Sequence, residues 1–332
     1  MITVRPFDYL RADDLAVALA EAEADSSAAY LAGGTTQLDL MKDGVLRPSR
    51  LIDITRLPLR GIEQSDGTLL IGSLTTMEEL AADSLVTQRL PLVREALLRS
   101  ASVQLRNMAT IGGNLLQRTR CRYFRDRTVA TCNKRVPGTG CGAIMGSHRT
   151  SAVLGTSENC IATHASDLAV ALIALDAVVH VTDTGGSRAI PLTGFYRTPG
   201  NTPDVENSLR PGELITAIEV PLLPVGAHSS YLKVRDRTSY EFALSSAAVA
   251  VTMEGSIVQS ARVALGGVAT MPWRAVEAEH VLTGAPARTE VFRTAARAAL
   301  AGAEPRPQNA FKVELAQRTL VRSLQSATGV SS

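Results

Sequence analysis

Residues 28–44 read AAYLAGGTTQLDLMKDG, an apolar run that stops at a pair of glycines and continues into a segment with helical spacing. The run Ala28–Ala32 favours a short strand, and Gly44 ends the helical segment. This stretch therefore predicts a strand, a glycine turn and a helix. A glycine turn lets the backbone approach a ligand and point N–H groups at an anion, although an ordinary tight turn is the more common explanation.

A second pair of glycines occurs in Thr110-Ile111-Gly112-Gly113-Asn114. Neither pair fits Gly-x-Gly-x-x-Gly or Gly-x-x-x-x-Gly-Lys-Ser/Thr, so the sequence supports neither a Rossmann site nor a P-loop. Each motif by itself is weak evidence for a turn that binds phosphate.

The composition is that of a globular protein. The chain has 332 residues, 45% hydrophobic and 20% charged, with a formal net charge of +2. Two or three domains are expected from this length, and both disorder and a strongly basic nucleic-acid binder are disfavoured. No apolar stretch reaches the roughly 18 residues of a membrane span, and the N-terminus lacks the features of a secretory signal. We expect a cytoplasmic location, or a periplasmic one if a signal-bearing partner exports the chain.

Hydrophobic periodicity and capping residues predict a mixed α+β protein of two or three lobes, with a first boundary near residue 58. Helices are expected at 13–24, 90–100, 166–175, 273–282, 289–301 and 313–324, and after the capping box Thr76-Met77-Glu78-Glu79. Strands are expected at 51–54, 69–72, 177–182, 215–220, 231–234, 247–253 and 257–265. The segment 107–160 is expected to be irregular.

All four cysteines, Cys121, Cys132, Cys141 and Cys160, lie within 40 residues. Four thiolates are the number that one cubane iron–sulfur cluster needs, although the intervals fit neither a zinc ribbon nor the compact ferredoxin pattern. Zinc remains an alternative, and two disulfides are a less favoured one because no signal peptide is present. Nearby cations would stabilise an anionic cluster; they are Arg118, Arg120, Arg122, Arg125, Arg127, Lys134 and Arg135.

Other polar residues have ordinary structural explanations. Asp167 follows Ser166 at a predicted helix N-terminus, where it can interact with the helix dipole or accept a hydrogen bond from a ligand hydroxyl. His164 fits a hydrogen-bonded loop histidine, and Lys233 fits a solvent-facing strand position. No Ser/His/Asp, His-Glu-x-x-His or paired-carboxylate motif is found, so no catalytic residue is predicted in this chain.

Taken together and in order, four motifs resemble the FAD-binding (medium) subunit of the molybdenum hydroxylases, the xanthine dehydrogenase and aldehyde oxidoreductase group. The motifs are Ala32-Gly33-Gly34-Thr35, Thr110-Ile111-Gly112-Gly113-Asn114, Ser166-Asp167-Leu168 and Tyr231-Leu232-Lys233. Within this group, the segment from Gln117 through Cys132 to Cys141 is similar to an insertion in bacterial aldehyde oxidoreductase flavin subunits that carry a [4Fe–4S] cluster.

The resemblance implies a vanillyl-alcohol-oxidase-like (PCMH-type) FAD-binding fold of two α+β lobes followed by a C-terminal α+β domain. Residues 1–58 would form the first FAD-binding subdomain, 59–222 the second, with the iron–sulfur insertion at about 117–160, and 223–332 the C-terminal domain of the flavoprotein type.

The resemblance also implies the cofactor residues. The glycine motifs would hold the FAD pyrophosphate, Asp167 would bond near the ribityl chain, and Lys233 would approach the pyrimidine end of the flavin ring. The expected FAD-binding residues are Ala32, Gly33, Gly34, Thr35, Thr36, Gln37, Thr110, Ile111, Gly112, Gly113, Asn114, Asp167 and Lys233. The cluster ligands would be Cys121, Cys132, Cys141 and Cys160. We expect the FAD contacts to lie outside the insertion.

The implied function is electron transfer in a heterotrimeric, molybdenum-dependent aldehyde oxidoreductase. A large molybdopterin-binding subunit would oxidise the aldehyde, and a small subunit with two [2Fe–2S] clusters would pass electrons to FAD and on to an external acceptor. Two alternatives stay open: a flavin and iron–sulfur subunit of a hydroxybenzoyl-CoA reductase-like enzyme, and a zinc-stabilised, non-redox assembly subunit. No nucleic-acid or membrane partner is expected, and the sequence identifies neither substrate nor acceptor.

Overall fold

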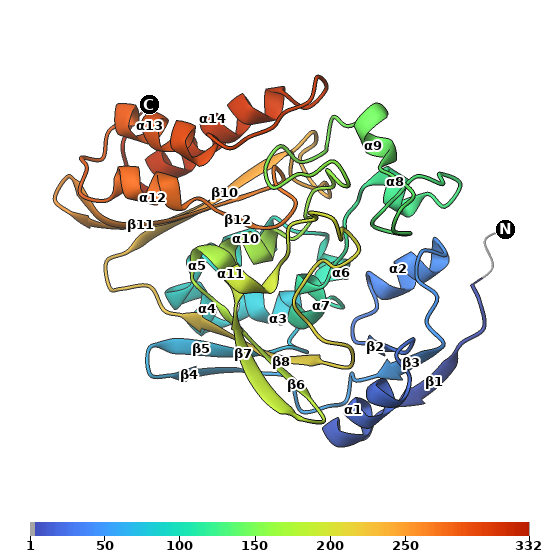
Figure 1. The fold of residues 1–332 in the computed structure, drawn as a ribbon. Helices are drawn as coiled ribbons and strands as arrows, with labels where there is room; N and C mark the ends of the chain where they lie inside the picture. Colours follow the sequence, from blue (N-terminus) through green and yellow to red (C-terminus); the bar gives the residue numbers. More distant parts are fainter. Residues whose placement is uncertain (1–3, 332) are drawn as a thin grey trace.

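The computed structural model describes residues 4–331 and contains three β-sheets (Figure 1). The first sheet is parallel, in the order β1 (Asp8–Arg11), β3 (Arg50–Asp53), β2 (Ala29–Leu31). Helix α1 (Leu15–Ala24) begins at Asp14, whose side chain accepts a hydrogen bond from the amide of Val17. Helix α2 (Gln37–Lys42) follows β2 through the predicted glycine turn. The strand, turn and helix predicted from residues 28–44 are therefore confirmed.

The second sheet is antiparallel, in the order β4 (Ile62–Ser65), β5 (Thr68–Gly72), β8 (Leu214–Pro221), β6 (Val178–Asp183), β7 (Gly186–Pro191). Helix α3 (Met77–Ala82) begins with the predicted capping box, which is fully formed between Thr76 and Glu79. The other helices of this part are α4 (Ser84–Arg89), α5 (Pro91–Leu98), α6 (Val103–Arg106), α7 (Ile111–Leu115), α10 (Asp167–Ala174) and α11 (Leu192–Phe195).

The third sheet is antiparallel, in the order β12 (Trp273–Arg274), β11 (Ile257–Gly266), β10 (Ser245–Glu254), β9 (His228–Val234). Helices α12 (Val276–Leu282), α13 (Thr289–Ala299) and α14 (Phe311–Thr328) cover its outer face (Figure 1). Helix α10 packs on the opposite face and is buried along its whole length. This helix joins the second and third sheets through one continuous apolar core, which explains why its sequence lacks a polar face.

Two sequence predictions need correction. The helix expected at 273–282 begins only at Val276, because Trp273 and Arg274 pair with Leu265 and Ala264 as strand β12. The second pair of glycines is not a free turn. Gly112 and Gly113 lie in the first turn of α7, which Thr110 caps through a side-chain hydrogen bond to the amide of Gly113.

The segment 107–160, which was expected to be irregular, contains only short helices: α7, α8 (Arg122–Arg125) and α9 (Gly142–Met145). Figure 1 shows α8 near α2, while Val153 and Leu154 of the same segment pack into the core under the C-terminal helices. Among residues 4–331, no helix is long and apolar enough to cross a membrane. The domain boundaries at 58 and 222 stay predictions.

Candidate functional site: a large cavity beside a cysteine-rich insertion

One large cavity, with a volume of about 540 Å³, is enclosed by residues of all three sheet regions. This volume lies in the usual range for sites of small molecules and cofactors. Twelve of the thirteen expected FAD-binding residues line it: Ala32, Gly33, Gly34, Thr35, Thr36, Gln37, Thr110, Gly112, Gly113, Asn114, Asp167 and Lys233. The exception is Ile111, which is fully buried in the hydrophobic core. Its side chain packs in the core, so the FAD contact expected at Ile111 stays a prediction that only its backbone could satisfy.

The glycines bring separate chain segments together at this cavity. A Cβ atom on Gly33 would lie 1.8 Å from the carbonyl oxygen of Met108, and one on Gly112 would lie 2.9 Å from Cβ of Ser73. Gly34 has φ +70°, a conformation that side chains disfavour. Glycine is thus required here by contacts between backbone segments, in addition to any approach of a ligand.

Three side chains that line the large cavity carry polar atoms without protein partners. Nε2 of Gln37, Oγ of Ser73 and Nε of Arg120 are each buried and have no hydrogen-bond partner among the described residues. An unsatisfied buried polar group costs about 1–3 kcal/mol. The three side chains come from separate segments, and a polar ligand in the cavity would supply partners for these atoms after small side-chain shifts.

Asp167 and Lys233 meet inside the cavity. Nζ of Lys233 donates to Oδ2 of Asp167 at 2.7 Å and to the carbonyl oxygen of Arg99 at 3.1 Å. The hydroxyls of Tyr231 and Ser100 donate to Oδ1 and Oδ2 of the same carboxylate, at 2.6 and 3.0 Å. Burial, followed by the charge of Asp167, raises the pKa of Tyr231. Lys233 is therefore a buried cation, not the solvent-facing lysine of the simple strand explanation.

The four cysteines surround a second, small cavity, the cysteine cavity, together with Phe124 and Lys134. All four thiols are free, so the disulfide alternative is wrong for this structure. Cys132 and Cys141 pair as an isolated antiparallel bridge. Burial raises the pKa of Cys160 to about 11 and also raises that of Cys121. Between residues 4 and 331, no three Cys, His, Asp or Glu side chains are positioned as a set of metal ligands.

Most basic side chains of the insertion bind the rest of the protein. Glu206 accepts hydrogen bonds from Nε of Arg118 at 2.5 Å and Nζ of Lys134 at 2.7 Å. Arg120 and Arg125 both pair with Asp39 of α2. These ion pairs attach the insertion to the body, and Lys134 also lines the cysteine cavity, so the stabilisation of an anionic cluster by these cations stays a prediction.

The insertion reaches the large cavity, which was not expected. Gln117, Arg118 and Arg120 line that cavity beside the glycine motifs. The expectation that every cofactor contact lies outside the insertion is therefore wrong for the cavity wall. Sequence reasoning missed these residues, and also Ser100 and Phe242, because no motif marks them as cavity residues. Arg120, for example, binds Asp39, which lies 81 residues earlier in the chain.

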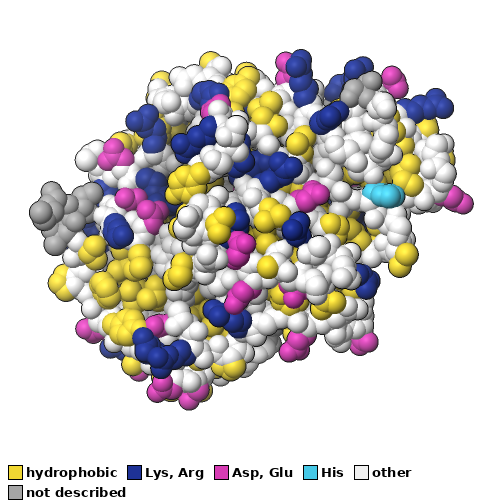
Figure 2. All heavy atoms as spheres, turned by 180° about the vertical axis from the view of Figure 1, so that it is seen from behind, with side chains coloured by type: hydrophobic (Ala, Val, Ile, Leu, Met, Phe, Trp, Pro, Cys, Tyr) yellow, Lys and Arg dark blue, Asp and Glu magenta, His cyan; other side chains and the backbone are white. Residues whose placement is uncertain are grey.

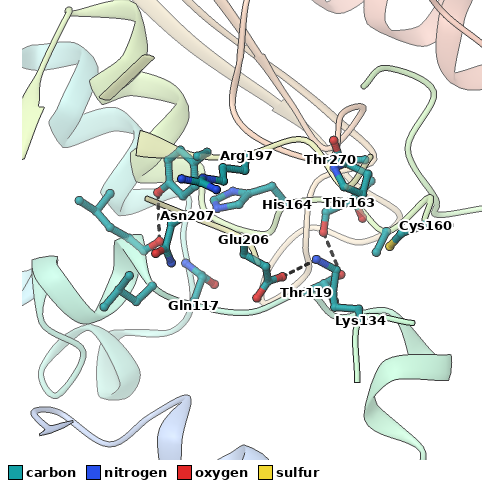
Figure 3. A pocket seen from close by; sticks show the side chains of 15 residues that line it. Gln117, Thr119, Lys134, Cys160, Thr163, His164, Arg197, Glu206, Asn207 and Thr270 are labelled. Carbon is teal, nitrogen blue, oxygen red and sulfur yellow. Dashed lines mark hydrogen bonds and ion pairs between the residues drawn. The ribbon is translucent and has the colours of Figure 1, made fainter. Parts of the chain in front are cut away.

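A third cavity, the His164 cavity, is drawn in Figure 3 and has lining residues in common with both of the others. It shares Cys160 and Lys134 with the cysteine cavity, and Gln117 with the large cavity. The amide of Ser166 donates to Nδ1 of His164 at 3.3 Å, while Nε2 is buried without a partner among the described residues. Figure 3 also shows the ion pair between Lys134 and Glu206.

Lowering the pH is expected to destabilise the protein through His164. Burial lowers the pKa of His164 from 6.5 to about 4. Between these values the unfolded imidazole binds a proton that the native one does not bind, so the free energy of unfolding falls as the pH falls. The contribution is up to about 3 kcal/mol.

His164→Gln should remove this contribution. Urea denaturation at pH 7 and pH 4.5 measures it as a smaller loss of stability in the variant than in the unmodified protein. His228→Gln, at an exposed position, is the control. An equal loss in all three proteins would contradict the assignment.

Known proteins resemble this chain over its whole length. Residues 5–223 match the FAD binding domain in molybdopterin dehydrogenase, and residues 230–327 match the CO dehydrogenase flavoprotein C-terminal domain. The chain is 48% identical to the aldehyde oxidoreductase FAD-binding subunit PaoB of Escherichia coli (strain K12), over 98% of this chain and 99% of that protein.

More distant relatives also match most of the chain. The carbon monoxide dehydrogenase medium chain of Afipia carboxidovorans is 29% identical, over 84% of this chain and 80% of that one. A chain of the solved carbon monoxide dehydrogenase from Hydrogenophaga pseudoflava superposes with a TM-score of 0.78 at 28% identity, covering 98% of this chain and 99% of that one. These relatives are subunits of oxidoreductases.

Proposed function

The chain belongs to the family of FAD-binding subunits of the molybdenum hydroxylases, and on that premise we propose that it is the electron-transfer subunit of a molybdenum-dependent aldehyde oxidoreductase. Electrons would pass from the molybdenum and [2Fe–2S] centres of a large and a small partner subunit, through FAD in this chain, to an external acceptor. The observation that carries this proposal is the convergence of both glycine motifs, Asp167 and Lys233 on one cavity of cofactor size. The 48% identity to an aldehyde oxidoreductase subunit favours an aldehyde as the substrate of the complex.

The large cavity fits FAD by its size and by the unpaired polar side chains around it. The turn at Gly33 and Gly34 and the first turn of α7 would hold the pyrophosphate, since both line the cavity. In α7 the amides of Ile111, Gly112 and Gly113 already donate to Thr75, Ser73 and Thr110, so this turn would act mainly by its close approach. When bound, FAD supplies the exchange of electrons between two-electron and one-electron carriers. The layout of the three sheet regions supports the vanillyl-alcohol-oxidase-like fold that we propose for this chain.

The chain's own residues prepare the cavity for a flavin. Asp167 holds Nζ of Lys233 at a fixed position, and Tyr231 and Ser100 hold Asp167. A buried cation fixed in this way would favour negative charge on the ring next to it. Asp167 would bind the ribityl chain only through oxygen lone pairs that these donors leave free.

We propose, as the sequence resemblance implies, a second cofactor, a [4Fe–4S] cluster held by Cys121, Cys132, Cys141 and Cys160. The supporting observations are four free thiols around one cavity and a segment with little regular structure. Four thiolate ligands are what such a cluster needs, and it would supply a one-electron carrier. The thiols would have to move from their positions in this structure and lose their protons, which burial now stabilises on Cys121 and Cys160.

The isolated chain is expected to bind one FAD and to leave aldehydes unchanged. The cavity contains the flavin residues, but we predict no molybdopterin site or catalytic residue in this chain. Absorbance near 450 nm and calorimetric titration measure the flavin, and an aldehyde assay with an artificial acceptor measures turnover. The complex assembled with its large and small subunits is the positive control. Failure to bind FAD, or aldehyde turnover by this chain alone, would overturn the proposal.

A further inference from the structure

We propose that Arg120 of the insertion is a flavin-binding residue, and that through it the order of the cysteine-rich segment controls the affinity of the large cavity for FAD. This inference rests on the proposed function. Arg120 immediately precedes Cys121 and lines the large cavity, so one side chain belongs to both proposed cofactor sites.

Contacts from two other chain segments fix the guanidinium of Arg120. Its Nη1 donates to Oδ2 of Asp39 in α2 at 3.1 Å. Its Cζ lies 4.9 Å from the ring centre of Phe242, in the loop between β9 and β10. Burial and the neighbouring Arg125 lower the pKa of Arg120. The side chain is thus held in one orientation, which reduces the entropy that it would lose on binding a ligand.

The Nε–H group of Arg120 is the donor left without a partner, and because it is not exposed to the cavity, a ligand would reach it only after a shift of the side chain. It is buried and has no acceptor among residues 4–331. Arg118 also lines the cavity, but its Nε already binds Glu206. Because Asp39 is shared with Arg125, an acceptor oxygen of FAD would complete the coordination of Arg120. Figure 2 shows from behind that Lys and Arg side chains gather in the upper half of that face.

Hydrogen bonds of the two residues that flank Arg120 connect it to the cysteine-rich segment. The amide of Cys121 donates to Oγ1 of Thr119 at 3.2 Å, and this hydroxyl donates to the carbonyl oxygen of Thr163 at 2.9 Å. Residues 119–121 are therefore one rigid turn. Any change that releases Cys121 also displaces Arg120 from the cavity wall. The effect is reciprocal by linkage, so bound FAD should in turn stabilise the cysteine-rich segment.

The test compares the FAD affinities of variants of the full chain, measured by quenching of flavin fluorescence. Arg120→Met should raise the Kd about tenfold to a hundredfold, the usual effect of losing a hydrogen bond to a charged donor. Arg120→Lys keeps a charge but lacks Nε–H, so its Kd should stay severalfold above that of the unmodified chain. Arg122→Met is the matched control, since Arg122 is exposed, follows Cys121 and does not line the cavity.

A double-mutant cycle tests the coupling. Cys121→Ser should weaken FAD binding in the unmodified chain but have little further effect in the Arg120→Met background. Circular dichroism shows whether each variant is folded. If Arg120→Met is not folded, Arg120→Lys still tests the proposal. FAD binding by folded Arg120→Lys that equals the unmodified chain would overturn the Nε–H contact, and fully additive effects would overturn the coupling. Failure of the unmodified chain to bind FAD would instead overturn the proposed function.

Discussion

Serine at Cys132 is expected to remove most of the iron from the protein and to disorder the insertion while leaving the chain able to bind FAD at saturating concentration. Cys132 is buried against Leu40 and Phe124 in a small apolar cluster that joins the insertion to α2. A [4Fe–4S] cluster that lacks one thiolate is unstable. Without the iron–sulfur cluster, the part of the insertion before Val153 has only this small apolar group of side chains as its core.

Iron analysis, the broad visible absorbance and limited proteolysis between residues 117 and 160 measure these effects. Met145→Ser is the control, because Met145 belongs to the same segment and its side chain is 92% exposed. Unchanged iron in Cys132→Ser, or equal iron loss in Met145→Ser, would contradict the assignment of Cys132 as a ligand.

Alanine at Gly33 is expected to abolish FAD binding and to destabilise the protein by about 3 kcal/mol or more. The added Cβ would lie 1.8 Å from the carbonyl oxygen of Met108, so the glycine turn must separate from residues 108–109. Those residues lead directly into Thr110 and α7, which also line the large cavity. The methyl group added at Gly33 would therefore push apart the two parts of the proposed pyrophosphate site.

Gly194→Ala is the matched control for this substitution. A Cβ at Gly194 would meet no atom within 4 Å, and the chemical change is identical. FAD titration and urea denaturation compare the two variants. The assignment would be contradicted if Gly33→Ala bound FAD as tightly as Gly194→Ala, because the structure leaves no space for that methyl group.

Local patterns predicted most of the regular structure. The capping box at Thr76, the Asp14 cap and the β-branched strand after α10 each depend on residues close in sequence, and each is present. Strand β12 was missed because two residues pair with β11 only once the third sheet has formed. The helical sequence pattern at Trp273 is therefore overridden by strand pairing with β11.

The candidate site could be predicted only in part, for the same reason. The glycine motifs are visible as motifs, but the close approach of Gly33 to Met108 joins segments 75 residues apart. The pairing of Lys233 with Asp167 spans 66 residues, and no periodicity reveals it. Arg120 has the same apparent context as its neighbouring arginines, and only the fold shows which one reaches the cavity.

Cofactor analysis of the full chain purified without oxygen tests the central claim most directly. The account predicts one FAD, four iron and four acid-labile sulfide per chain, with flavin bands above a broad iron–sulfur absorbance. Flavin accompanied by zinc, or by oxidised cysteines without iron, would contradict the cluster and leave the flavin assignment intact. A chain that contains zinc and binds no flavin would contradict the redox function itself.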